Sequence, residues 1–498
     1  MTEAKPALIP PRYWGYVSLA LWAIATLLLL RHSPYVLDEG GAKALLLDWS
    51  IGDQVASSVV TLGLPDMRAI LWLPLGFLWP GQILAAKVTL IAVLAWTAYG
   101  LYAWRRQAGS EEVALLGTGL LLIAPVSLQQ VDTLSPGILL LAIFTAGFWM
   151  DRAYRTAPRP FGGLYFAQLV FCAFAVSLHP AGIAYPLSLA WAWRTNPVDR
   201  SQQRYFYVGI AIVSCLALLL RWGWHDLGAW QNPLRQAATW VTATDLESVE
   251  LDTGEWAVGA VLTGLVVTLL MWQRRLYWND LLGRTLWWGV LLGALLCDAS
   301  WGFLAVALLC YGGFEWLLKP REVIAGKGFF LQRGWVLFLL LILSTLFMRG
   351  DRAWYEQGKG QVMTAQDQVI RQFANDVDRT RVVAEEKRLP MPRIRVASQW
   401  PARTMIACRC DALPLPPAAK DPETQLTIMR GLTHLIFAPN AQKNIGLVQN
   451  LSQLGTDIQT VSLQPGGVIL KVRSPVLAPL PAMPAAPPVP TSGSSGSH

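Results

Sequence analysis

Residues 86–104 read AKVTLIAVLAWTAYGLYAW, an apolar run that carries one charged residue, Lys87, near its start and is followed directly by Arg105-Arg106. A helical crossing of a bilayer uses about 20 predominantly apolar residues. The run is therefore predicted to be a transmembrane helix.

The rest of the chain has the same character. It has 498 residues, of which 54% are hydrophobic and 14% charged, with 24 Trp and a mean hydropathy of +0.38. Such a composition excludes an ordinary water-soluble globular protein and predicts an α-helical polytopic membrane protein. About eleven spans are predicted, near 14–30, 86–104, 113–130, 134–150, 164–178, 180–193, 206–222, 257–273, 285–297, 301–318 and 335–348. Residues 69–83 fit either a twelfth span or an interfacial helix.

The basic residues predict the orientation of this bundle. The formal net charge is +8, but Lys and Arg lie between the apolar runs, so we exclude nucleic-acid binding as its cause. With the N-terminus inside, they concentrate in the inner loops, as the bias of basic residues towards the cytoplasm requires. The first run lacks a small-residue cleavage site and is interpreted as a retained span. An odd number of spans then places the C-terminal part outside.

The C-terminal part has a different composition. Residues 349–474 are predicted to form a small α/β domain with a polar helix over 362–388 and strands at 394–397, 433–437 and 468–472. Residues 475–498 form a Pro- and Ala-rich tail that ends in a Ser-Gly linker.

The six Cys show neither a zinc pattern nor a disulfide framework. Cys408 and Cys410 are the only close pair. Because their spacing is tight for a relaxed disulfide, two free or separately paired thiols are expected.

Acidic residues gather at the outer ends of the spans. Asp38 and Glu39 follow the first span, and Asp132 lies in the short outer turn between the third and fourth spans. Carboxylates near the membrane surface suit a general base or a metal ligand, but each of these residues also fits a helix cap. Asp132 is expected to emerge close to Asp38, at one rim of the bundle.

Cations and aromatic residues lie on the same predicted face. Lys87 and Arg68 could meet an anionic head group, or simply extend to the interface. His179 could contact a phosphate or be an ordinary turn residue. The outer loop 223–256 includes Trp224-His225-Asp226, which suits sugar or acceptor recognition, although an interfacial aromatic belt explains the tryptophans equally well.

The order of these features resembles the GT-C superfamily of integral-membrane glycosyltransferases, in particular the bacterial branch of the lipid A aminoarabinose transferase and the protein O-mannosyltransferases. The resemblance rests on Asp38-Glu39 after the first span, on LWLPLGFLWPG at 71–81 before Ala85-Ala86-Lys87, on the Asp132 turn, and on Ser177-Leu178-His179-Pro180. Gly40-Gly41 stands where relatives commonly carry aromatic and basic residues.

The resemblance implies a glycosyltransferase that moves a sugar from a polyprenyl-phosphate donor to an acceptor hydroxyl at the periplasmic face of the bacterial inner membrane. It implies Asp38 as general base, Glu39 and Asp132 as supporting acids, and Lys87, Arg68 and His179 as contacts for the lipid phosphate. The acceptor would be a membrane lipid, an envelope glycan or an exported protein. No cofactor is expected to be required, although some relatives use a divalent cation.

Two alternatives come from other classes. A non-catalytic GT-C-like scaffold would bind a lipid-linked glycan or a partner protein. A solute transporter is disfavoured because no internal repeat is present and the acids gather at one face.

Overall fold

A computed structural model describes twelve main stretches of the chain and a few isolated residues near the N-terminus. The described residues are 20, 22–24, 26–27, 37–52, 68, 82–108, 111–156, 162–195, 200–219, 280–295, 302–308, 365–390, 394–439, 444–454, 458–464 and 466–472.

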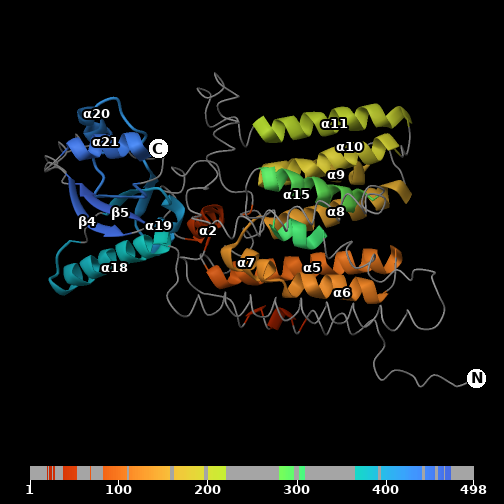
Figure 1. Ribbon diagram of the computed structural model, residues 1–498, viewed down its shortest axis with the longest axis horizontal. Helices are drawn as coiled ribbons and strands as arrows, with labels where there is room; N and C mark the ends of the chain where they lie inside the picture. The colour runs from red at the N-terminus through yellow and green to blue at the C-terminus, as the bar shows by residue number, and fades with distance from the viewer. Residues whose placement is uncertain are drawn as a thin grey trace, which may run out of the picture.

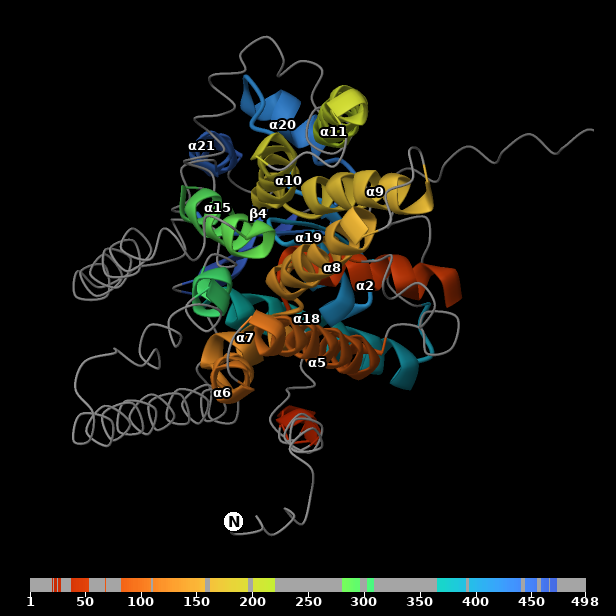
Figure 2. The same ribbon diagram turned by 90° about the vertical axis from the view of Figure 1, so that its right-hand side faces the viewer.

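The larger part of the molecule is a bundle of helices that run roughly along its longest axis (Figure 1). Figure 2 shows several of the same helices close to end-on. Their bounds are α5 Ile83–Ala108, α6 Glu111–Ile123, α7 Pro125–Thr133, α8 Gly137–Thr156, α9 Gly163–Leu178, α10 Ala184–Thr195, α11 Arg200–Leu218 and α15 Leu281–Leu295. A shorter helix, α2 (Glu39–Gly52), lies between the bundle and the C-terminal domain (Figure 1).

The predicted span 113–130 is wrong in one respect, because two helices replace it. The backbone of Ala124 is extended (φ −64°, ψ 131°), and α7 begins at Pro125. A proline has no amide hydrogen to continue the helix and disfavours helical backbone at the residue before it. The break separates α6 from α7, the helix that carries Asp132.

Two described helices, Ile83–Gln107 and Gly137–Thr156, are long and apolar enough to cross a membrane. Shorter apolar helices cover Gly163–Leu178, Gln203–Leu218 and Leu281–Leu292. The predicted spans 257–273 and 335–348 lie outside the described residues, as does most of 14–30. The number of eleven crossings therefore stays a prediction.

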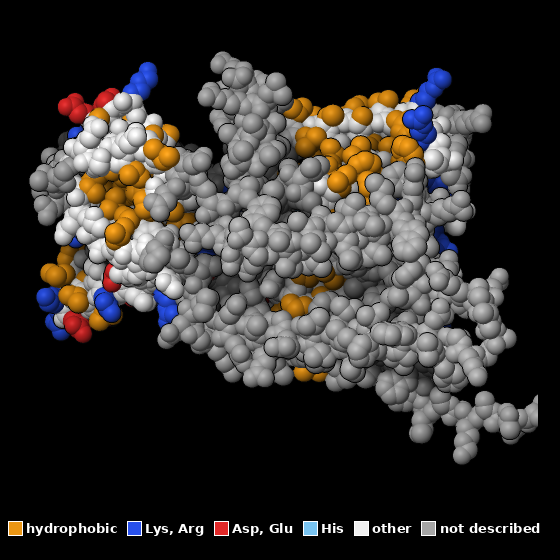
Figure 3. All heavy atoms as spheres, in the orientation of Figure 1, with side chains coloured by type: hydrophobic (Ala, Val, Ile, Leu, Met, Phe, Trp, Pro, Cys, Tyr) orange, Lys and Arg blue, Asp and Glu red, His pale blue; other side chains and the backbone are white. Residues whose placement is uncertain are grey.

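Close packing inside the bundle contrasts with its apolar surface. The rings of Trp193 and Phe206 stack with their centroids 3.9 Å apart, joining α10 to α11. Outward-facing side chains are apolar, such as Val170 at 63% and Val208 at 56% exposure. Figure 3 shows hydrophobic side chains over this part of the bundle, with Lys and Arg at the end away from the C-terminal domain. An apolar surface of this kind is typical of contact with lipid.

The C-terminal domain holds a five-stranded mixed sheet in the order β2-β1-β3-β5-β4. Strand β1 pairs in parallel with β2 and β3, and β5 pairs antiparallel with β3 and β4. The bounds are α18 Ala365–Glu386, β1 Arg395–Ser398, α19 Pro401–Cys408, β2 Asp411–Pro414, α20 Pro422–Ile428, β3 His434–Phe437, α21 Ile445–Gln453, β4 Ile458–Gln464 and β5 Gly467–Val472. The polar helix and the three strands expected from the sequence lie at α18, β1, β3 and β5.

The expectation of two free or separately paired thiols is wrong. Cys408 and Cys410 form a disulfide with their Cα atoms 5.2 Å apart. Helix α19 ends at Cys408, and Arg409 takes the left-handed conformation (φ 47°, ψ 46°). This turn folds the chain back, so that two cysteines separated by one residue reach the Cα spacing that ordinary disulfides have.

Candidate functional site

The candidate site lies where the start of α2 meets the turn between α7 and α8. Leu134 ends α7 in the left-handed conformation (φ 59°, ψ 35°), which a branched residue adopts only when its surroundings hold it there. The peptide amide of Asp38 donates to the carbonyl oxygen of Thr133 at 2.9 Å. Asp38 and the α7–α8 turn, which are far apart in sequence, are therefore joined through their backbones.

Asp38 acts first as the cap of α2. Its Oδ1 accepts a hydrogen bond from the amide of Gly41 in the first turn, so the cap interpretation of this residue applies. A Cβ on Gly41 would lie 2.7 Å from that oxygen and 2.8 Å from Leu134 Cβ. Only glycine allows α2 to approach the turn this closely, and the Gly40-Gly41 pair was the sequence signal for it.

The same carboxylate forms an ion pair with Arg68. Nη1 of Arg68 lies 2.9 Å from Oδ1 and 2.8 Å from Oδ2 of Asp38, and 2.7 Å from the carbonyl oxygen of Leu134. The Arg68 side chain is 7% exposed, whereas that of Asp38 is 34% exposed. One carboxylate is thus held in place beside a cation and still reaches the surface.

Asp132 forms a second, deeper ion pair. Nζ of Lys87, in the first turns of α5, lies 2.5 Å from Oδ1 of Asp132 on α7, and both side chains are 0% exposed. Asp132 therefore does not cap the next helix, and Lys87 does not extend to the interface. In this structure the pair is part of the packed core beneath the α7–α8 turn.

Glu39 points to a different partner, the start of α19 in the C-terminal domain. Its Oε1 accepts from the amide of Ala402 at 2.6 Å, and its Oε2 accepts from the amide of Arg403 at 3.3 Å. Burial at this contact raises the pKa of Glu39 to about 7, against the lowering effects of the two amides and of Arg403. No sequence signal marks Ala402 and Arg403, because their role is to present backbone amides.

The remaining predicted residues lie elsewhere. Nδ1 of His179 accepts from the amide of Ala181 at 3.1 Å and caps the short 3-10 helix η2 (Pro180–Ile183). This bond supports the interpretation of His179 as a turn residue. Trp224, His225 and Asp226 lie outside the described residues.

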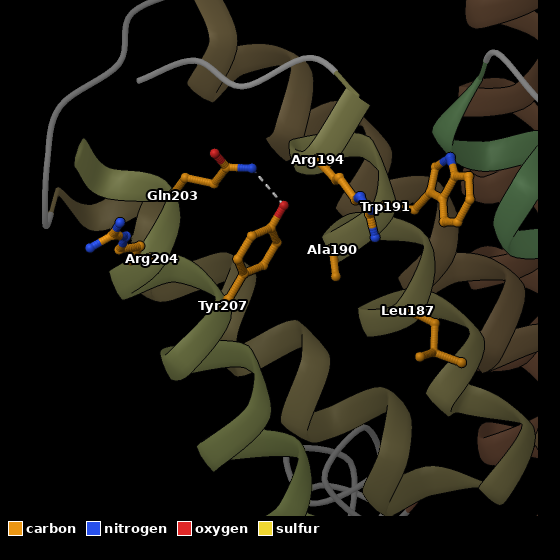
Figure 4. A pocket seen from close by; sticks show the side chains of 7 residues that line it. All are labelled: Leu187, Ala190, Trp191, Arg194, Gln203, Arg204 and Tyr207. Atoms are coloured by element: carbon orange, nitrogen blue, oxygen red, sulfur yellow. Dashed lines mark hydrogen bonds between the residues drawn. The ribbon is translucent and has the colours of Figure 1, made fainter. Parts of the chain in front are cut away.

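Two cavities with described linings lie away from Asp38 and Asp132. A groove of about 560 Å³ runs between α10 and α11, and in Figure 4 Arg194 and Trp191 face Gln203 and Tyr207 across it. A smaller cavity lies among α8, α10 and α15. Neither is lined by the predicted site residues, so an isoprenoid groove beside Asp38 stays a prediction.

The described residues do not form a metal centre. No group of three His, Cys, Asp or Glu side chains that could hold a metal ion occurs among them. Both oxygens of Asp38 are bonded to Arg68, and Glu39 faces α19. These side chains, as placed, do not fit a divalent cation, and no chemical step below passes through one.

Comparisons with known proteins identify the fold. No protein-family model matches the chain, and no curated protein matches it. Among solved structures, it is similar to the crystal structure of ArnT from Cupriavidus metallidurans in the apo state, with 12% sequence identity and a TM-score of 0.51 over 92% of this chain and 98% of that one. ArnT is a GT-C lipid A aminoarabinose transferase. The chain described here therefore has a GT-C-like fold.

Proposed function

We propose that this protein is a membrane glycosyltransferase that moves a sugar from a polyprenyl-phosphate donor to an acceptor hydroxyl at the periplasmic face of the inner membrane. The observation that carries the proposal is the partly exposed Asp38 carboxylate, held beside Arg68 at the α2–α7 junction. The GT-C-like fold supports it, because the ArnT structure has the same overall arrangement.

Exposure separates the roles of the three acids. Asp38 is 34% exposed at its side chain, Asp132 is fully buried against Lys87, and Glu39 is bonded to α19. A general base must come within hydrogen-bond reach of the proton that it removes. Asp38 is therefore the proposed base. Asp132 and Lys87 support the turn on which Asp38 rests, and Glu39 holds the C-terminal domain.

The proposed step is a displacement at the anomeric carbon of the donor. Asp38 takes the proton of the acceptor hydroxyl, and the acceptor oxygen forms a new bond to the anomeric carbon. The bond from that carbon to the phosphate oxygen breaks, and the polyprenyl phosphate leaves with the electron pair. Arg68 lies beside Asp38, where its positive charge would favour the growing charge on the phosphate.

The donor and the role of Asp38 are tested together in cells that lack the gene. Cells carrying the wild type, Asp38→Asn or the exposed control Glu386→Gln are compared by mass spectrometry of lipid-linked sugars and envelope glycans. We expect one polyprenyl-phosphate sugar to accumulate without the gene and with Asp38→Asn, but not with the wild type or Glu386→Gln. Normal glycans with Asp38→Asn at wild-type protein levels would rule out the catalytic role. Parallel assays with a chelator test the dependence on a divalent cation.

One observation favours the scaffold alternative. Arg68 and Lys87, two of the cations expected to meet the donor phosphate, are each bonded to an acid in this structure. A scaffold predicts that Asp38→Asn leaves every envelope glycan unchanged. It also predicts that the purified protein retains a lipid-linked glycan without turning it over.

A further inference from the structure

A cavity of about 210 Å³ lies at the end of the bundle opposite the candidate site. It is enclosed by the last turns of α8 and α10 and the first turn of α15. At about 1.5 Å per residue, Asp151 lies roughly 20 Å along α8 from Gly137, which follows the Asp132 turn. Its charged and polar lining residues are Asp151, Arg152, Arg155, Thr195, Asp280 and Arg284.

Arg284 is the unusual member of this lining. It is only 4% exposed, yet its Nε and Nη1 atoms have no hydrogen-bond partner in the part of the chain that the structure describes. A buried guanidinium is strongly destabilising unless its N–H groups are bonded to acceptors. The cavity therefore needs a group with acceptor oxygens against Arg284.

Asp151 adds a second requirement. Its Oδ2 pairs with Nε of Arg155 at 2.6 Å, but its Oδ1, on a residue that is 5% exposed, lacks a partner among the described residues. A carboxylate oxygen needs a hydrogen-bond donor. The missing group must therefore carry an O–H or N–H donor in addition to its acceptor oxygens.

The charge of the cavity selects an anion. Three arginines, Arg152, Arg155 and Arg284, face two aspartates, Asp151 and Asp280, so the lining keeps a net positive charge. Arginine binds phosphate oxygens with strong charge-assisted hydrogen bonds. A volume of 210 Å³ also leaves room for a group larger than a bare phosphate.

We propose that this cavity binds a phosphate ester that carries a hydroxyl or amino group, with its phosphate on Arg284 and its donor on Asp151. Two sources share this chemistry: the head group of a membrane phospholipid and a small soluble phosphate ester. The proposal does not rest on the glycosyltransferase function, because it concerns the opposite end of the bundle.

The test uses the full-length protein, delipidated in a maltoside detergent that contains no phosphate. Thermal unfolding and native mass spectrometry are measured with added phosphatidylglycerol, phosphatidylcholine or glycerol 3-phosphate. We expect phosphatidylglycerol or glycerol 3-phosphate to bind and to raise the unfolding temperature. Phosphatidylcholine should bind more weakly, because its trimethylammonium group has no N–H for Asp151. Preference for the lipid or for the soluble ester identifies the source.

Arg284→Gln provides the decisive comparison, and Arg194→Gln, on the exposed groove of Figure 4, is the matched control. Without ligand, Arg284→Gln should be at least as stable as the wild type, because it removes a buried unpaired charge. With ligand, its affinity should fall about tenfold or more, as expected for the loss of charge-assisted hydrogen bonds. Arg194→Gln should behave like the wild type.

A second variant, Thr195→Phe, keeps every charge and puts a bulky side chain on the lining, so it should also weaken binding. Two results would overturn the proposal. One is that none of the three probes binds the wild type. The other is that both Arg284→Gln and Thr195→Phe bind as tightly as the wild type.

Discussion

At the scale of single residues, the candidate site depends on a close approach and a buried ion pair. Gly41 lets α2 touch the Leu134 turn, and Lys87 neutralises Asp132 beneath it. Neither glycine nor lysine is proposed to do chemistry. Both decide where Asp38 lies, which is what a base needs in order to reach its substrate.

Gly41→Ala should therefore lower both stability and sugar transfer. The added methyl group would meet Asp38 Oδ1 at 2.7 Å and Leu134 Cβ at 2.8 Å, and overpacking of this kind costs about 1–3 kcal/mol. Thermal unfolding and glycan analysis measure the two effects. The control is Gly119→Ala in α6, where an added Cβ would meet nothing within 4 Å. Equal behaviour of the two variants would contradict the close approach.

The Lys87–Asp132 pair is tested by a double-mutant cycle. Lys87→Met or Asp132→Leu alone leaves one buried charge without its partner, which costs about 3–5 kcal/mol. The double variant should lose much less than the sum of the two, because no unpaired charge remains. Unfolding free energies in detergent give the coupling. Additive losses would show that the two side chains do not depend on each other.

At the scale of elements, α2 links the two parts of the molecule. Asp38, just before its first residue, is bonded to Arg68 and to the α7–α8 turn, while Glu39, the first residue, is bonded to the start of α19. Adjacent acids thus face opposite ways. We infer that a displacement of α19 would be felt at Asp38, because only one peptide bond separates the two contacts.

The α2–α19 contact should weaken as the pH rises. Glu39 lies beyond the first apolar run, and its pKa is raised from 4.5 to about 7 in the contact. The docked state thus binds more protons than the separated state between these values. Its stability is complete below pH 4.5 and falls as the pH rises to about 7. Hydrogen exchange at the amides of Ala402 and Arg403 measures this loss of protection.

Glu39→Gln is the control for that pH dependence. Glutamine keeps an acceptor oxygen for the amide of Ala402 but does not ionise. Protection of α19 in this variant should be independent of pH across the same range. The same pH profile in both proteins would mean that another group causes the effect.

At the scale of the whole molecule, charge and shape divide the bundle into two different ends. The candidate site and the C-terminal sheet lie at one end (Figure 1). At the other end, the C-terminal turns of α8 and α10 and the start of α15 bring Arg155 and Arg284 to one cavity. The excess of basic residues at this end predicts that it faces the cytoplasm.

That orientation is tested by cysteine labelling in a background whose free cysteines are replaced by serine. Lys420 and Arg106 are both exposed and lie in the C-terminal domain and at the basic end of α5, respectively. A membrane-impermeant maleimide should label Lys420→Cys in spheroplasts and Arg106→Cys only after lysis. The reverse pattern would invert the proposed topology and place Asp38 at the cytoplasmic face.

The sequence by itself determined the classes of structure in this protein. Apolar runs predicted the helices α5, α8 and α9, and alternating patterns predicted β1, β3 and β5 in the C-terminal domain. These signals are local, since hydropathy and periodicity are properties of some five to twenty consecutive residues. Asp38 and Asp132 could be selected for the same reason, as acids at the ends of apolar runs.

Only the tertiary structure decided the partners of these residues. Arg68 pairs with Asp38 across 30 positions, Lys87 with Asp132 across 45, and Glu39 meets Ala402 across 363. The left-handed turn at Arg409 likewise brought Cys408 and Cys410 together. An ion pair or a cap depends on distances of a few ångströms between side chains and backbone groups from different helices, and these distances exist only once the helices have packed.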